Sequence, residues 1–282
     1  MGELSIITSL ETLGRDYDAL LCDAWGVIHD GVTLFPGAEE ALMRFRETRG
    51  AVVILTNAPR PSVIIPPQLD RLGLSRDAYD AVVTSGDATR AAIEARLPAP
   101  AYKLGPPKDD PLFEGLEIDF RPLEEAAFII CTGMMDEFTQ SPEDYRELLI
   151  AARARELPMV CANPDIVVNW GGKIIWCAGA LAEIYEQLGG EVTYGGKPHQ
   201  PIYDLALKAI NAQQGETPRG RILAVGDGLN TDIKGANNQG IDVLMVAGDG
   251  GIHKGARDGA TLAAQLDAAG LHAIAAAEAL RW

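Results

Sequence analysis

The sequence has 282 residues, of which 47% are hydrophobic and 23% are charged. This length exceeds what one hydrophobic core usually organises, so we expect a main domain with a smaller second one, and the composition excludes a disordered chain. A net charge of −16 makes most of the surface repel a phosphate backbone, which argues against nucleic acid as a partner.

The N-terminal segment and the cysteines both bear on the cellular compartment. The start Met-Gly-Glu-Leu-Ser lacks the basic residues and the long apolar stretch of a secretory signal, and no segment approaches about 18 uninterrupted apolar residues. We therefore expect a cytoplasmic chain that has no membrane partner. The widely spaced cysteines are expected to be reduced core residues: Cys22, Cys131, Cys161 and Cys177.

Short apolar runs rich in β-branched residues recur from the N-terminus, each followed by a turn and then by helical periodicity. The run at 19–22 is followed by a helix through residues 38–48, and the strands at 51–55 and 81–83 repeat the pattern. Two prolines in the segment 65–67 are expected to interrupt a helix there. This alternation is typical of a parallel α/β sheet.

Two later runs, 221–225 and 241–246, complete that sheet, which we expect to have four or five strands. A helix is expected from about residue 200 to residue 211. The alanine-rich end from Ala260 to Ala279 predicts two terminal helices.

The segment 88–192 has a different texture, since prolines crowd its beginning and Gly-Gly pairs mark its end. Within it we expect strands near 127–131, 159–161 and 166–168, and helices at 142–156 and 180–188. We therefore predict that residues 88–192 form a second domain inserted into a first one made of residues 1–87 and 193–282.

Polar residues follow the buried strands of the expected first domain. Because ligands bind beyond the carboxyl ends of the strands in an open parallel sheet, we expect these residues to be neighbours. The set consists of Asp23, Thr56, Asn57, Asp227, Asp232 and Lys197.

Each residue type in this set has a chemical use. Carboxylates close together need a cation, and Mg²⁺ prefers oxygen ligands at about 2.1 Å, so the side chains of Asp23 and Asp227 should lie within roughly 8 Å. Lys197 and the Thr56 hydroxyl would bind phosphoryl oxygens, leaving Asp23 as a nucleophile. Taken singly, these residues are more often helix caps, turns or solvated charges, and only their combined order favours a site.

Four segments in this order resemble the motifs of the haloacid dehalogenase (HAD) superfamily: Asp23-Ala-Trp-Gly-Val27, Leu55-Thr56-Asn57, Gly196-Lys197-Pro198 and Gly226-Asp227-Gly-Leu-Asn-Thr-Asp232. Thr84-Ser-Gly-Asp-Ala-Thr89 and Ala162-Asn-Pro-Asp165 resemble class IIA members, the NagD-like and p-nitrophenylphosphatase-like phosphatases. The similarity extends from about residue 16 to residue 250.

The resemblance implies a Rossmann-like HAD core with an inserted C2-type α/β cap, and a Mg²⁺-dependent phosphatase that acts on a small phosphorylated metabolite through an aspartyl phosphate. It implies that Thr56, Asn57 and Lys197 bind the substrate. The implied metal ligands are Asp23, the backbone carbonyl of Trp25, Asp227 and Asp232. Capped relatives often pair through the cap, so a homodimer is one option. The loop at 163–165 is a weak candidate for substrate specificity, because an Asn-Pro-Asp segment is more often a structural turn.

Trp25 departs from the family pattern, because the phosphatases carry at this position an Asp that serves as general acid and base. An indole N–H donates no proton at useful pH, and general acid catalysis is typically worth about 10²–10⁴ in rate. Three outcomes stay open: slow hydrolysis of activated esters, substitution of the acid by His29 or Asp30, or ligand binding without turnover. A metal-independent dehalogenase is a further alternative, although Asp227 and Asp232 favour phosphoryl chemistry.

Overall fold

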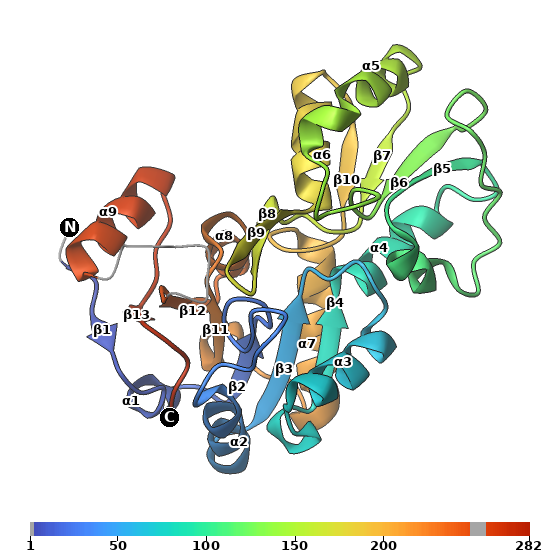
Figure 1. Cartoon of the computed structure of the whole chain (residues 1–282). Helices are drawn as coiled ribbons and strands as arrows, with labels where there is room; N and C mark the ends of the chain where they lie inside the picture. The colour runs from blue at the N-terminus through green and yellow to red at the C-terminus, as the bar shows by residue number, and fades with distance from the viewer. Residues whose placement is uncertain (1–2, 249–257) are drawn as a thin grey trace.

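The computed structural model describes residues 3–248 and 258–282, and Figure 1 shows two lobes, each built around its own sheet. All strands of the larger sheet are parallel. In spatial order its seven strands are β1 (Ile6–Ile7), β13 (Ala275–Ala277), β12 (Asp242–Val246), β11 (Ile222–Gly226), β2 (Ala19–Cys22), β3 (Ala51–Thr56) and β4 (Ala81–Thr84).

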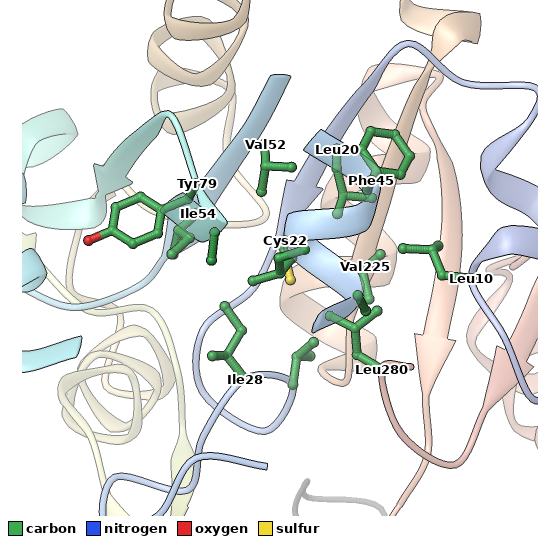
Figure 2. Packing of buried hydrophobic residues seen from close by; sticks show 14 of the residues in the cluster. Leu10, Leu20, Cys22, Ile28, Phe45, Val52, Ile54, Tyr79, Val225 and Leu280 are labelled. Carbon is green, nitrogen blue, oxygen red and sulfur yellow. The ribbon is translucent and has the colours of Figure 1, made fainter. Parts of the chain in front are cut away.

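Helices cover both faces of this sheet, because side chains alternate between the faces along each strand. Leu20 and Cys22 belong to one buried cluster, shown in Figure 2, whereas Ala19 and Leu21 belong to the other. The first face packs against α1 (Glu11–Gly14), α2 (Ala38–Thr48) and α3 (Ile65–Leu72). The second face packs against α7 (Gln200–Gln214), α8 (Lys234–Gln239) and α9 (Gly259–Ala269).

The smaller sheet is also parallel, with the order β10 (Val192–Tyr194), β7 (Met159–Cys161), β6 (Phe128–Cys131) and β5 (Ala101–Leu104). One of its faces packs against α5 (Arg146–Ala154) and α6 (Ala178–Gln187). Its other face packs against Ile93 of α4 (Ser85–Glu94), whereas Ala88 of the same helix packs against the larger sheet. Helix α4 therefore spans the two lobes.

An antiparallel hairpin lies between the lobes in Figure 1. It consists of β8 (Val167–Trp170) and β9 (Lys173–Trp176) and belongs to neither sheet. The hairpin contacts the loop that follows β2, since the backbone N–H of Gly171 donates to the carbonyl of Asp30 at 3.2 Å. This places the hairpin next to the segment that contains Asp23 and Trp25.

The structure confirms the predicted α/β fold with a parallel-sheet core, and all five expected strands of the main sheet are present. The sheet is larger than expected because β1 and β13 extend it beyond β12. In the smaller lobe, β5, β9 and β10 were not expected. The division of the chain into domains at residues 88 and 192 stays a prediction.

Two local expectations were wrong, and a third needs a small change. Pro66 and Pro67 lie in the first turn of α3 and do not interrupt it, because that turn needs no backbone N–H donors from them. The alanine-rich terminus forms one helix, α9, followed by the strand β13. The helix expected at 142–156 is present over residues 142–154, but its first turn, Pro142–Tyr145, is 3₁₀ and α5 continues from it.

All four cysteines are free and buried, as expected. Among the described residues, no helix combines the length and apolarity that a membrane crossing requires.

Candidate active site

Three carboxylates that are far apart in the sequence meet at the carboxyl edge of the larger sheet. Asp23 follows β2, Asp227 follows β11, and Asp232 lies in the π-helical turn Leu229–Ile233. One oxygen from each of the three carboxylates lies within 4.8 Å of the other two, and all three residues are buried. The separation of Asp23 and Asp227 is thus well within the 8 Å expected from one shared cation.

The backbone segments that carry these carboxylates lie very close to one another. The N–H of Asp23 donates to the carbonyl of Val225 at 2.9 Å, which continues the pairing of β2 with β11. A Cβ on Gly26 would lie 2.4 Å from an Asp227 carboxylate oxygen, and a Cβ on Gly226 would lie 2.2 Å from the Asp232 Cβ. Only glycine fits at these two positions without displacing a carboxylate.

Lys197 provides the positive charge within this cluster. Its Nζ donates to Asp23 Oδ1 at 2.7 Å and to Asp232 Oδ1 at 2.6 Å, and only 2% of the residue is exposed. Burial lowers the pKa of Lys197, but the charges of Asp23 and Asp232 outweigh burial and hold this pKa well above its ordinary value. The lysine therefore stays protonated.

The charges of the cluster do not balance. Burial and the neighbouring Asp232 charge raise the pKa of Asp23 well above its ordinary value, although Lys197 opposes the rise. One lysine faces three acidic groups, all of which offer the hard oxygen ligands that Mg²⁺ and Ca²⁺ prefer. The donor set therefore fits a divalent cation, which would supply the missing positive charge.

Asn57 holds Lys197 in place. Its Oδ1 accepts from the Lys197 backbone N–H at 2.8 Å, and its Nδ2 donates to Asp165 Oδ1 at 2.9 Å. Desolvation raises the pKa of the half-buried Asp165 to about 6, against the lowering effect of the Lys197 charge. The Asn57 amide is thus bonded to protein groups, and it links the lysine to the loop at 163–165.

The indole of Trp25 makes structural contacts and takes no part in proton transfer. Its indole Nε1 donates to the backbone carbonyl of Asn169 in β8 at 2.8 Å, and its ring makes an edge contact with the His29 ring at 5.2 Å between centroids. The side chain thus ties the loop after β2 to the β8–β9 hairpin. No feature of the sequence indicates this contact with Asn169.

His29 and Asp30 were the two candidates for replacing the missing acid. Neither of them holds a transferable proton at neutral pH. Burial lowers the pKa of His29 to about 4, and its Nδ1 accepts from the Gly31 backbone N–H at 3.0 Å. The Asp30 carboxylate accepts from the backbone of Val32 and from the backbone and hydroxyl of Thr33, and these bonds lower its pKa despite desolvation. His29 is neutral and Asp30 is ionised.

Two cavities adjoin at the cluster and share Trp25, Asp165 and Val168 in their walls. The smaller one is lined by the three clustered carboxylates. The larger one begins at Thr56, whose Oγ1 accepts from the Ala58 backbone N–H at 3.3 Å, and reaches into the smaller lobe as far as Thr132. A bound molecule could therefore place one end beside Asp23 and the rest between the lobes.

Known proteins share this architecture. A haloacid dehalogenase-like hydrolase model matches residues 20–118, and a HAD-hydrolase-like model matches residues 194–270. The crystal structure of a haloacid dehalogenase-like family hydrolase from Brucella suis 1330 is 42% identical, has a TM-score of 0.88, and matches over 98% of this chain and 100% of that one. This chain belongs to the haloacid dehalogenase-like hydrolase family.

Other similar proteins are more distant. D-glycerol 3-phosphate phosphatase from Mycobacterium tuberculosis is 27% identical over 241 residues; the match covers 84% of this chain but only 65% of that enzyme. The fold is also that of a 4-nitrophenylphosphatase from Thermotoga maritima, with 23% identity, a TM-score of 0.69, and coverage of 95% and 96% of the two chains. The predicted HAD resemblance is thus confirmed.

Proposed function

We propose that this HAD hydrolase is a Mg²⁺-dependent phosphatase that transfers the phosphoryl group of a small phosphorylated metabolite to Asp23. The observation that carries the proposal is the contact of Lys197 Nζ with both Asp23 and Asp232, inside a buried triad of carboxylates. The phosphatase names of the mycobacterial and Thermotoga relatives support it.

The first step forms a bond between an Asp23 carboxylate oxygen and phosphorus and breaks the ester P–O bond. The leaving oxygen keeps the electron pair of that bond. Lys197 and the Thr56 hydroxyl contact the phosphoryl oxygens and stabilise the charge that develops on them. Mg²⁺ held by Asp23, the Trp25 carbonyl, Asp227 and Asp232 would add positive charge beside the same oxygens.

In the second step, water attacks the phosphorus of the aspartyl phosphate, which releases inorganic phosphate and restores the Asp23 carboxylate. Because Trp25, His29 and Asp30 offer no proton, the leaving oxygen takes its proton from water. We therefore expect esters of acidic alcohols and acyl phosphates to react faster than alkyl phosphates.

The test is a steady-state assay of aryl, alkyl and acyl phosphates, with and without Mg²⁺, on the wild type and the Asp23→Asn variant. We expect turnover that requires Mg²⁺ and that falls at least about 10³-fold in Asp23→Asn, because this variant lacks the attacking carboxylate. Circular dichroism and thermal unfolding check that the variant is folded.

Other results would assign a different function. Binding of phosphate esters without turnover would make the chain a phospho-ligand binding protein. Halide release from haloacids without metal would make it a dehalogenase. Turnover that survives in Asp23→Asn would remove Asp23 as the nucleophile.

A further inference from the structure

The larger cavity is lined by buried polar atoms that make no hydrogen bond. Asp109 is 1% exposed and Thr132 is 3% exposed, and neither Asp109 Oδ1 nor Thr132 Oγ1 makes a hydrogen bond. Arg60 Nε is buried without a hydrogen bond as well. It faces Asp109 Oδ1 at 3.6 Å, which is too long for a hydrogen bond, and all three residues line the cavity.

These three residues come from separate parts of the chain. Arg60 lies four residues beyond β3, in the segment that begins with Thr56. Asp109 lies in the 3₁₀ turn Pro107–Phe113, and Thr132 directly follows β6 of the smaller sheet. Buried polar groups normally find partners, and a group left without one is costly, so a set of three at one cavity indicates a ligand site.

The chemistry of the set favours hydroxyl groups as its ligand. A hydroxyl both donates and accepts, so one hydroxyl placed between Asp109 Oδ1 and Arg60 Nε satisfies both. Among the described residues that line the cavity, the cations Arg60 and Lys108 each face a carboxylate, Asp109 and Glu137 respectively, so a second anionic group on the ligand would gain no net attraction here.

Another part of the cavity lining is apolar. Trp170, Ile175 and Trp176 of the β8–β9 hairpin line it together with Trp25. Small-molecule sites commonly combine such aromatic walls with a few polar groups that fix the ligand's orientation. A ligand that carries both hydroxyls and C–H groups matches this mixed lining.

We propose that Arg60, Asp109 and Thr132 form a subsite for the hydroxyl groups of a polyol or sugar phosphate whose phosphoryl group is bound at Asp23. The inference rests on the proposed phosphatase function and specifies its substrate class. Burial raises the pKa of Asp109 to about 6, with Arg60 opposing the rise, so this carboxylate is mainly an ionised acceptor at pH 7.

The test compares substrates that differ only in hydroxyl groups. Glycerol 3-phosphate is paired with propyl phosphate, and ribose 5-phosphate with pentyl phosphate, which samples two ligand lengths. We expect the wild type to prefer the hydroxylated member of at least one pair in kcat/KM by 10-fold or more, because a site built to bind hydroxyls rejects analogues that lack them.

Asp109→Asn and Thr132→Val should reduce this preference about 10-fold while leaving turnover of propyl and pentyl phosphate within about 3-fold. Asp110→Asn is the matched control, because Asp110 neighbours Asp109 but is exposed and paired with Lys103. Equal losses for both members of a pair, or no preference in the wild type, would overturn the subsite.

A wild type that turns over no ester with Mg²⁺ would remove the proposed function, and the subsite would then be judged by binding. Calorimetric titration with the same two pairs gives the comparison. Tighter binding of the hydroxylated member, lost in Asp109→Asn, supports the subsite; equal binding of both members, or no binding at all, rejects it.

Discussion

Two groups of polar residues lie in adjoining cavities: the carboxylate cluster around Asp23, and the polar wall formed by Arg60, Asp109 and Thr132. They differ in how their polar groups are paired. In the cluster, Lys197 bonds to two carboxylates and Asn57 fixes the lysine backbone. In the wall, Arg60 and Asp109 face each other without a hydrogen bond. The groups proposed for chemistry are fixed before a ligand arrives, and those proposed for recognition keep their bonding capacity for the ligand.

This difference agrees with what each task requires. Stabilising a transferring phosphoryl group needs charges that are already oriented, because reorienting them during the reaction costs rate. Recognising an alcohol needs donors and acceptors that the protein has not already satisfied. This division of roles can be tested by substitutions in the cluster and around it.

The largest effect is expected for Lys197→Met, which leaves Asp23 and Asp232 buried without their shared cation. Breaking a buried ion pair from one side typically costs about 3–5 kcal/mol of stability, and losing a key electrostatic group about 10²–10³ in turnover. We expect both losses, with Mg²⁺ partly restoring the stability. Thermal unfolding with and without Mg²⁺ measures the first and a phosphatase assay the second.

Lys208→Met is the control for this variant, because it removes an exposed lysine from helix α7, just beyond Lys197. It should change neither quantity. If Lys197→Met kept wild-type stability without metal, the cluster would not be the charged, pre-paired site described above.

A smaller effect is expected for Trp25→Asp, which alters the wall that the two cavities share. Restoring a carboxyl group beside Asp23 supplies a general acid, so turnover of alkyl phosphates should rise by about 10². Turnover of 4-nitrophenyl phosphate should rise less, since its leaving group needs no proton. Steady-state kinetics on both substrates give the ratio.

Trp25→Phe separates the acid from the loss of the indole. It removes the hydrogen bond to the Asn169 carbonyl and adds no acid, so it should give no gain on alkyl phosphates. A folded Trp25→Asp protein without any gain would contradict the view that a missing acid limits this enzyme.

The cluster was predictable from the sequence because of a rule of sheet topology. Residues that follow buried parallel strands meet at one edge, so Asp23, Asp227 and Thr56 could be grouped before the structure was known. The Asp109 wall follows no such rule. Arg60, Asp109 and Thr132 show no shared spacing, and only the packing of the two lobes brings them to one cavity.

The errors in the predicted fold and site have a similar origin. Ala275–Ala277 reads as helix because alanine is the strongest helix former, yet its place beside β12 in a buried sheet makes it a strand. The side chain of Trp25 was expected only to lack an acid, and its bond to β8 depends on a hairpin 144 residues further along the chain. Long-range contacts override local preference in both cases.

The smallest effect on turnover is expected at His29, which contacts the Trp25 ring in a cavity also lined by Thr56 and Arg60. Burial lowers its pKa to about 4, so between pH 4 and the ordinary value near 6.5 the unfolded chain binds more protons than the folded one. The free energy of unfolding should therefore fall as pH drops from about 6.5 to 4, by roughly 3 kcal/mol in all.

The variant His29→Asn retains an acceptor for the Gly31 N–H, and it should remove this pH dependence when unfolding is measured in urea. The control is His272→Asn, which removes an exposed imidazole. If His29→Asn instead abolished turnover of alkyl phosphates and spared 4-nitrophenyl phosphate, His29 would be the missing acid and would belong with the catalytic cluster.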